Sequence, residues 1–330
     1  MKRFGNFYPE IYDFSNLYFS FLKVKKGKRY KREILEFSFN LEENLFNLQE
    51  DLKNETYKHG GYKTFIVRDS KKREIKAPRV RDRVVHHALC NLINPFFDNI
   101  FYNYSYACRK GKGNHMAVAD VKRKLNKKDG FYCFQSDVSK YFDSVNHCFL
   151  YKIIKKKIKD TKVLKLIREI IKRNEKGIPI GNLTSQLFAN IYLNELDQFV
   201  KRKLNIKYYF RYMDDFLIFS MDKKYLREIK EKVQIFLKEK LKLEYKEKAT
   251  RVFPICLGID FLGYIIYKEY ILLRKKTVLR LVKKLKGKDF SIAFYSWKAY
   301  SKKSKSYNLA QKIFNKLFCW QIILRMYNGN

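Results

Sequence analysis

Two adjacent carboxylates, Asp214 and Asp215, lie between two runs of aromatic and aliphatic residues within the segment 209–219. Such residues fit a pleated, half-buried strand, and the short connection around Met213 has turn chemistry, so the segment predicts a hairpin with acid at its tip. Neighbouring carboxylates repel each other unless a cation neutralises them, and magnesium prefers oxygen ligands. A solvated Asp-Asp turn is the alternative, but the aromatic flanks indicate a buried setting. The pattern therefore predicts a divalent-metal site.

A third carboxylate, Asp137, follows another aromatic strand, which covers residues 131–136. A two-metal site needs ligands that converge from separate strands, and Asp137 is independent in sequence from Asp214. The alternative is that Asp137 only caps the helix expected to run through Ile153 and Ile154. We expect Asp137 to join the two acids of the hairpin.

If the metal site serves a nucleotide, two features near these acids would position that nucleotide. Phe142 would stand beside the sugar if the turn packs over the site, and its ring leaves no room for a 2′-hydroxyl. Deoxynucleotides would then be favoured. The segment 177–197 predicts a loop and helix, in which Gly181 allows close backbone approach and Thr184 or Ser185 could cap the helix. An ordinary loop and helix is the alternative.

A predicted hairpin over residues 62–77 carries a basic tip. There Arg68, Lys71 and Arg73 would reach the phosphates of an incoming nucleotide, because a triphosphate needs charged donors beyond its metals. A solvated basic loop is the alternative.

Two further basic segments have compositions that are suited to binding nucleic acid. Aromatics, cations and glycines mix over residues 104–113, a composition that could grip a single strand. From Lys275 onward the chain predicts a basic helix that could track a duplex backbone without reading sequence, with a solvated lysine face as the alternative. The expected contacts are Arg109, Lys110 and Lys112 in the first segment, and Arg280, Lys283 and Lys284 in the second.

The remaining apolar periodicity predicts helices and strands that support the site without taking part in its chemistry. Apolar residues recur three or four positions apart over residues 33–53, which predicts one amphipathic helix. A second helix begins near residue 80 and is interrupted by Pro95. Its adjacent His86 and His87 face different directions, so they are core or template-contacting residues rather than metal ligands. A charged helix over residues 223–240 and a glycine-punctuated hairpin over residues 257–266 complete the scaffold.

The composition points to a nucleic-acid partner. The 330 residues are 46% hydrophobic, enough for a large core and two or three subdomains. Lys and Arg number 72 against 33 Asp and Glu, and a net charge of +39 would repel itself severely without a polyanion. An anionic membrane surface is disfavoured, because the aromatics are spread along the whole chain.

Nothing in the sequence predicts a signal for export or a segment that spans a membrane. No apolar run approaches the ~18 residues of a membrane span, and the N-terminus lacks a signal-peptide core. The six cysteines are scattered without a Cys-x-x-Cys pair and are expected to be reduced core residues. We expect a cytoplasmic protein.

Three blocks in one order resemble the palm motifs of reverse transcriptases. They are the strand and turn at Asp137, the loop and helix from Gly181 to Leu196, and Tyr-Met-Asp-Asp at 212–215. Residues 180–186 read Ile-Gly-Asn-Leu-Thr-Ser-Gln, where most group II intron and retron enzymes carry Gln-Gly-x-x-x-Ser-Pro. This variant resembles the reverse transcriptases of diversity-generating retroelements. The segments 81–89, 106–113 and 296–300 point the same way.

The resemblance implies an α+β right-hand polymerase fold with fingers, a palm built on an antiparallel sheet, and a helical thumb. It places the fingers and an N-terminal helical extension in residues 1–130 and the palm in 131–268. An inserted finger segment lies near 152–186, and residues 269–330 form the basic thumb.

The resemblance also implies an RNA-directed DNA polymerase, bacterial or phage-encoded, that makes cDNA from a template-repeat RNA with frequent errors at template adenines. Its partners would be dNTPs, the RNA/cDNA duplex and a small basic helical accessory protein. Two magnesium ions, for which manganese could substitute, would serve in-line nucleotidyl transfer. The implied metal ligands are Asp137, Val138 (by its carbonyl), Asp214 and Asp215, and the implied nucleotide contacts are Arg68, Arg73, Phe142, Ile180, Gly181, Ser185 and Gln186.

Two other interpretations stay open. One is a retron-like or phage-defence reverse transcriptase, against which the Ser185-Gln186 variant weighs. The other is a catalytically silent RNA-binding scaffold. A silent descendant would be free to lose mutually repelling carboxylates, so the three retained acids disfavour it.

Overall fold

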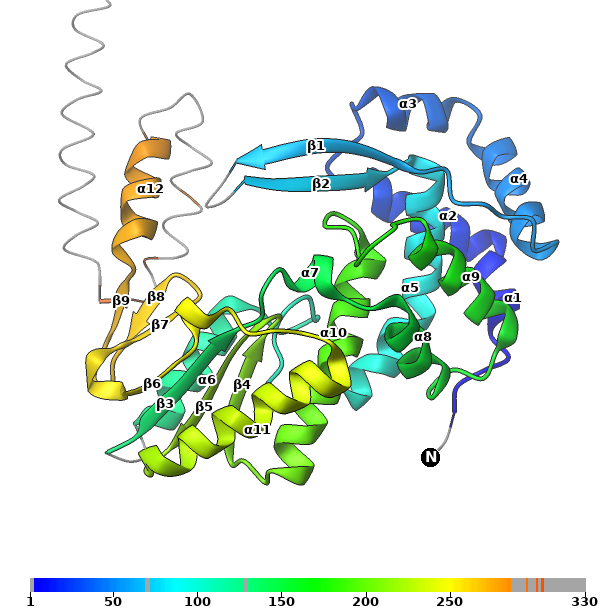
Figure 1. Ribbon diagram of the computed structural model, residues 1–330. Helices are drawn as coiled ribbons and strands as arrows, with labels where there is room; N and C mark the ends of the chain where they lie inside the picture. Colours follow the sequence, from blue (N-terminus) through cyan, green and yellow to red (C-terminus); the bar gives the residue numbers. More distant parts are fainter. Residues whose placement is uncertain are drawn as a thin grey trace, which may run out of the picture.

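The computed structural model describes residues 3–68, 72–126 and 130–285, together with positions 295, 301, 304 and 305 (Figure 1). The first part of the chain is mostly helical and carries one antiparallel hairpin, β1–β2. Its elements are α1 (Tyr8–Tyr12), α2 (Phe14–Lys25), α3 (Arg32–Phe39), α4 (Leu41–Lys53), β1 (Tyr62–Arg68), β2 (Lys72–Pro78), α5 (Val80–Ile100) and α6 (Asn114–Leu125).

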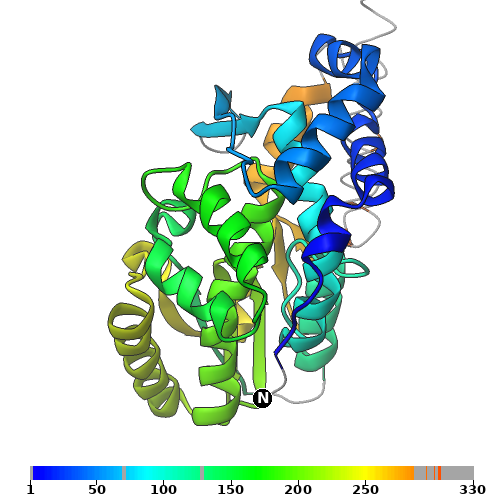
Figure 2. The same cartoon turned by 90° about the vertical axis from the view of Figure 1, so that its right-hand side faces the viewer.

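The second part builds the central sheet and its covering helices. The elements are β3 (Tyr132–Asp137), α7 (Tyr141–Ser144), α8 (His147–Lys155), α9 (Thr161–Lys172), α10 (Leu183–Gln198), η1 (Phe199–Lys203), β4 (Tyr208–Tyr212), β5 (Asp215–Ser220), α11 (Lys223–Leu241), η2 (Glu247–Ala249) and β6 (Arg251–Pro254). After η3 (Ile255–Leu257) come β7 (Ile259–Phe261), β8 (Tyr264–Ile266), β9 (Ile271–Leu273) and α12 (Lys275–Leu285). In both views the blue N-terminal helices lie at the opposite end of the molecule from α11 (Figure 1, Figure 2).

The central sheet has the strand order β4-β5-β3-β6, and every neighbouring pair is antiparallel. Both of its faces are covered. Phe216 and Ile218 of β5 join a core with α10 and α11, whereas Leu217 and Phe219 join a second core with α6 and the small sheet β7-β8-β9. The expectation of a half-buried strand is therefore wrong for β5, because a strand buried on both faces reads as a continuous apolar run.

The predicted helix over residues 33–53 is two helices. Asn40, with φ −114° and ψ 51°, leaves the helical region between α3 and α4. Asn44 Nδ2 donates to the Phe37 carbonyl at 3.1 Å, so a side chain serves a carbonyl at the break. Asparagine competes in this way for backbone groups, which an apolar periodicity does not reveal.

Two other expectations about helices are wrong. The helix α5 runs through Pro95 to Ile100 rather than being interrupted, since burial of Ile93 and Phe97 on either side outweighs the lost backbone bond. Neither Thr184 nor Ser185 caps α10, because the helix begins at Leu183 and buries both hydroxyl side chains.

The described part of the chain contains no helix whose length and apolarity would let it cross a bilayer. The described cysteines, at 90, 108, 133, 148 and 256, are free thiols. Cys90 and Cys133 are fully buried, whereas Cys108, Cys148 and Cys256 are exposed, so the expectation of core residues is wrong for these three. Burial raises the pKa of the Cys90 thiol to about 12. A thiol with that pKa is a core residue rather than a nucleophile.

Candidate active site

The pairing of β3 with β5 sets Asp137 opposite Asp215 in the antiparallel register. The predicted hairpin of β4 and β5 is confirmed. Its turn contains Met213, which has a left-handed φ of 56°, and Asp214, whose carbonyl accepts a hydrogen bond from the Val138 N–H at 3.3 Å. The three predicted acids therefore lie together at one end of the central sheet.

Burial and mutual repulsion both act on these acids. Burial, followed by the charge of Asp137, raises the pKa of Asp214 from 3.8 to about 6. Burial, followed by the charges of Asp137 and Asp214, raises the pKa of Asp215 well above its usual range. Asp215 Oδ1 is buried without a hydrogen-bond partner among the described residues. A carboxylate oxygen in such a position is costly unless a donor or a cation reaches it.

The donor set fits a hard divalent cation. Carboxylate and carbonyl oxygens are the ligands that magnesium and manganese prefer, and Asp215 offers one oxygen that nothing else satisfies. Within the described ranges, no group of three or more His, Cys, Asp or Glu side chains forms a ready-made metal cage. The fit therefore rests on the chemistry of the donors and on the unsatisfied oxygen.

Sequence reasoning missed Lys246, whose Nζ lies 2.9 Å from Asp137 Oδ2. Backbone bonds hold its segment against the end of β3. The Lys246 N–H donates to the Asp137 carbonyl at 2.9 Å, and the Ser139 N–H donates to the Glu244 carbonyl at 2.8 Å. The ammonium neutralises one of the three acids. No local pattern marks this pair, because the two residues are 109 positions apart.

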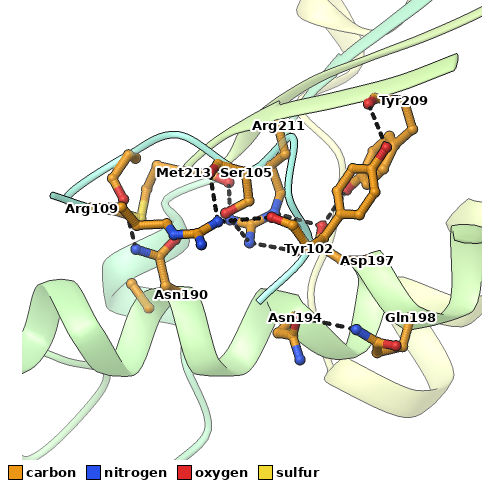
Figure 3. Close-up of polar contacts among 12 residues, drawn as sticks. Tyr102, Ser105, Arg109, Asn190, Asn194, Asp197, Gln198, Tyr209, Arg211 and Met213 are labelled. Atoms are coloured by element: carbon orange, nitrogen blue, oxygen red, sulfur yellow. Dashed lines mark hydrogen bonds and ion pairs between the residues drawn. The ribbon is translucent and has the colours of Figure 1, made fainter. Parts of the chain in front are cut away.

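Sequence reasoning also missed a buried ion pair that supports the acidic turn (Figure 3). Arg211 is fully buried, and its Nε and Nη2 donate to the Asp197 carboxylate at 2.7 and 2.6 Å. Its Nη1 donates to the Met213 carbonyl at 3.0 Å and to Asn190 Oδ1 at 3.3 Å, and Nη2 also reaches Ser105 Oγ at 3.2 Å. One guanidinium therefore ties β4, α10 and the loop after α5 to the turn that presents Asp214.

The loop before α10 contacts the β1–β2 hairpin. The Lys76 N–H of β2 donates to the Ile180 carbonyl at 2.9 Å. Gly181 has a φ of +118°, and a side chain on it would collide with Ile75 and approach the Lys76 carbonyl. Glycine is required there by both conformation and space. The structure thus brings Ile180 and Gly181 beside the hairpin, as a nucleotide-binding loop would require.

Arg68 and Arg73 lie near the far end of that hairpin and are exposed. Their Cα partners across the two strands are Lys72 and Val67. Lys71, at the predicted basic tip, lies outside the described residues.

Phe142 lies in α7, just after the turn that follows Asp137, and is half-buried. Its carbonyl accepts a hydrogen bond from the Ile178 N–H at 2.8 Å, so its backbone is tied to the segment before α10. The ring meets that of Tyr141 edge-on, with centroids 5.7 Å apart. Phe142 is thereby fixed to two segments that flank the acids.

Ser185 and Gln186 differ in their surroundings although they are adjacent on α10. Ser185 is buried, whereas Gln186 is exposed and lines a pocket of about 520 Å³. Arg109 and Lys110, predicted to contact nucleic acid, line the same pocket. The structure therefore brings together residues that came from two separate predicted sites.

The side chain of Arg109 bonds to other residues of this chain. Its side chain is only 6% exposed and forms an ion pair with Asp98 at 2.5 Å. It also donates to the carbonyls of Tyr102 and Ser105 at 2.8 and 2.9 Å. These bonds hold the loop after α5, and they lend no support to the prediction that Arg109 grips nucleic acid.

The other basic residues predicted to contact nucleic acid differ in their exposure and in the bonds that they make within the chain. Lys112 Nζ donates to the carbonyl and the side chain of Asn103 at 2.8 and 2.9 Å. Lys110 is exposed and makes no hydrogen bond or ion pair within the described part of the chain. Arg280 and Lys283 are exposed on α12, while the side chain of Lys284 and the segment 296–300 lie outside what the structure describes.

The chain has bacterial sequence relatives, one of which is encoded by a group II intron. It is 27% identical over 277 residues to protein YkfC of Escherichia coli, covering 70% of this chain and 73% of that protein. It is 25% identical over 298 residues to the group II intron-encoded protein LtrA of Lactococcus lactis, covering 68% of this chain and 49% of the relative. The chain thus spans about half the length of LtrA.

Among solved structures, a telomerase of Candida albicans, in complex with a fragment of telomeric RNA, matches with a TM-score of 0.50. The match has 11% sequence identity and covers 82% of this chain and 58% of the telomerase chain. At that identity the match shows the fold alone, and it agrees with the predicted right-hand polymerase fold. The sequence profile described as reverse transcriptase (RNA-dependent DNA polymerase) matches residues 58–266. The chain therefore belongs to the reverse transcriptase family, whose members are RNA-directed DNA polymerases.

Proposed function

We propose that this chain synthesises DNA on an RNA template by nucleotidyl transfer at Asp137, Asp214 and Asp215. The observation that carries the proposal is the register that sets Asp137 opposite Asp215, beside the turn that presents Asp214. The net charge of +39 supports a nucleic-acid substrate, because only a polyanion would relieve that repulsion.

The three aspartates, with the Val138 carbonyl, would hold two divalent cations, magnesium or its substitute manganese. When bound, these cations would favour ionisation of the primer 3′-hydroxyl and neutralise the triphosphate. The chain's own residues provide the geometry. The sheet register spaces Asp137 and Asp215, and Arg211 holds the backbone of the turn.

A nucleotide site follows from the contacts around the acids. Ile180, Gly181 and Ser185 would face it from the α10 side, Phe142 would close on the sugar, and the sequence places Gln186 in the same motif. Arg68 and Arg73 of the hairpin would reach the phosphates. The bond from Lys76 to the Ile180 carbonyl supports this arrangement, since it joins the hairpin to the loop.

For the domains we propose fingers with an N-terminal extension in residues 1–130, a palm in 131–268 with an inserted segment near 152–186, and a thumb in 269–330. On the thumb, Arg280, Lys283 and Lys284 would track the RNA/cDNA duplex, with Arg280 and Lys283 exposed as that role needs.

Within the family we propose a reverse transcriptase of the diversity-generating type. The support is the Ile-Gly-Asn-Leu-Thr-Ser-Gln segment at 180–186, which departs from the group II intron and retron pattern. This subtype would copy a template-repeat RNA, make errors at template adenines and work with a small basic accessory protein.

The test is primer extension on RNA with dNTPs and magnesium, using Asp214→Asn and Asp215→Asn variants. The amides keep the shape but cannot neutralise two cations, so the rate should fall at least about 100-fold while RNA binding is kept. Glu43→Gln, an exposed acid-to-amide change on α4, is the matched control and should extend normally. RNA binding without extension by the wild-type protein would instead favour a silent scaffold.

A further inference from the structure

A cluster of polar side chains lies on the side of Asp215 that faces the small sheet β7-β8-β9. In the antiparallel register Gln135 lies opposite Leu217, two residues beyond Asp215. Gln135 and Asp215 are therefore diagonal neighbours on one face of the central sheet. That face packs against the small sheet, since Leu217 shares a core with Phe261 of β7. Gln135 is thus placed between Asp215 and β7.

Gln135 links β3 to β7 and acts on Asp215 at the same time. Its Nε2 donates to the Asp260 carbonyl of β7 at 2.7 Å. Burial, the largest influence on Asp215, raises the pKa of that carboxyl, whereas hydrogen bonding by Gln135 lowers it. An amide nitrogen carries two N–H groups, so one amide can serve both the carbonyl and the carboxylate.

Arg274 brings a positive charge to the same cluster. Its Nη2 forms an ion pair with Asp260 Oδ1, and its charge also lowers the pKa of Asp215, again against the larger effect of burial. The backbone of Arg274 is fixed on both sides. Its N–H donates to the Gly263 carbonyl at 3.0 Å, and its carbonyl accepts from the Thr277 N–H at 2.8 Å. Arg274 therefore lies where the small sheet continues into α12 (Figure 1).

These contacts give Asp215 the kind of support that metal ligands receive in proteins. Side chains that bond to a ligand fix its orientation, and their loss weakens metal binding even though they never touch the metal. Lys246 supports Asp137 by a direct ion pair. Gln135 and Arg274 support Asp215 from the side of the small sheet, and both act on it in the same sense.

We propose that Gln135 and Arg274 are positioning residues for Asp215, which hold its carboxylate in place for a divalent cation. The inference rests on the proposed function, in which Asp215 is a metal ligand. Neither residue needs to contact the cation, a nucleotide or the nucleic acid. Because Arg274 also pairs with Asp260, the start of α12 and the acidic site share one set of contacts.

The experiment measures the binding of manganese to the full chain by electron paramagnetic resonance, without nucleic acid or dNTPs. Gln135→Met keeps the length of the side chain but removes its N–H groups, and it should weaken manganese binding about tenfold. Arg274→Met should act in the same direction, whereas Arg274→Lys keeps a positive charge and should retain part of the affinity. Gln234→Met and Arg227→Met, exposed on α11, are the matched controls and should bind manganese as the wild type does.

Primer extension at several manganese concentrations gives a second measurement. A raised concentration should restore the rate of Gln135→Met toward that of the wild type, because this variant still carries all three acids. It should not restore Asp215→Asn, which lacks one of the ligands. A protein that had only lost packing would instead lose stability to urea and keep its affinity for manganese.

The proposal is overturned if Gln135→Met and Arg274→Met bind manganese as tightly as the wild type, or if the wild type binds none. Should Gln135→Met not fold, Arg274→Met, whose side chain is partly exposed, decides the question alone. A wild type that extends primers, beside variants of unchanged affinity, would reject the positioning role alone. A wild type that binds manganese through these residues but makes no DNA would reject the polymerase proposal alone.

Discussion

Arg211 and Asp197 form an ion pair in which both side chains are fully inaccessible to solvent, with Nη2 and Oδ2 2.6 Å apart. Every hydrogen-bonding nitrogen of the guanidinium has a partner, and one partner is the carbonyl of Met213 in the turn that presents Asp214. Burying two charges is unfavourable unless they are paired and hydrogen-bonded, so the pair depends on both members. Its role is to hold the position of Asp214.

Removing one member of this pair should therefore destabilise the protein. Arg211→Met leaves the Asp197 carboxylate buried and alone, at a cost of about 3–5 kcal/mol. Arg211→Lys keeps the charge but loses the fork that bonds both carboxylate oxygens, so it should recover only part of the stability. Urea unfolding of the three proteins measures this. An Arg211→Met protein as stable as the wild type would show that the pair is dispensable.

Phe142→Ala should let ribonucleotides enter the nucleotide site. The ring would otherwise occupy the space beside the sugar, and its removal makes room for a 2′-hydroxyl. The measurement is the ratio of dNTP to rNTP incorporation in primer extension. Phe39→Ala, which removes an exposed ring on α3, is the control and should keep the wild-type ratio. An unchanged ratio in Phe142→Ala would place the discrimination elsewhere.

Ile180→Gln should lower misincorporation, most visibly opposite template adenine. Related enzymes carry glutamine at this place, and an amide can donate to the sugar or template base, whereas isoleucine offers only contact area. One neutral hydrogen bond contributes ~0.5–1.5 kcal/mol, or roughly two- to twelvefold in selectivity. Sequencing of cDNA made on one RNA template gives the error frequency. Ile235→Gln, exposed on α11, is the control. Equal adenine errors in both variants would reject the role of Ile180.

His86 should make the fold sensitive to acid. Burial, followed by the charge of His59, lowers its pKa from 6.5 to about 3, and neither ring nitrogen has a hydrogen-bond partner in the described residues. Below pH 6.5 the unfolded chain takes up a proton that the folded chain refuses until about pH 3. The free energy of unfolding should therefore decrease as the pH falls through this window, by up to about 1.4 kcal/mol per pH unit.

Denaturant unfolding of the wild type and His86→Leu at several pH values would measure this contribution. The carboxylates titrate in both proteins, so the difference between the two curves isolates the histidine. Leucine cannot be protonated, and its curve should be flatter between pH 6.5 and 3. Parallel curves would mean that His86 is protonated in the folded state.

The three acids of the proposed active site could be predicted because local signals mark them. Asp214 and Asp215 interrupt an aromatic run with turn chemistry, and Asp137 ends a strand, so both strands and the turn follow from residue types alone. The convergence of Asp137 with the two acids of the hairpin follows from the need for ligands on separate strands. The register itself depends on long-range packing of both sheet faces, which no local pattern contains.

The supporting residues were harder to predict. Arg211 carried a signal, because a lone cation between Phe210 and Tyr212 in a buried strand requires a buried partner. Its partner Asp197 lies 14 residues earlier on an apolar helix, where sequence alone gives no pairing. Lys246 carried no signal at all, since it is one lysine among many until the fold sets it beside Asp137. The break at Asn40 likewise has no signal in the apolar periodicity, although Asn44 Nδ2 bonds the Phe37 carbonyl across it.

The hydrogen bond from the Lys76 N–H to the Ile180 carbonyl joins two segments about a hundred residues apart in sequence, one in the hairpin and one in the loop before α10. A swing of the hairpin must either break this bond or carry the loop along. In the second case the hairpin, Ile180 and Gly181 move together as one unit. Any change in the position of the hairpin would then change the position of Ile180 and Gly181 as well.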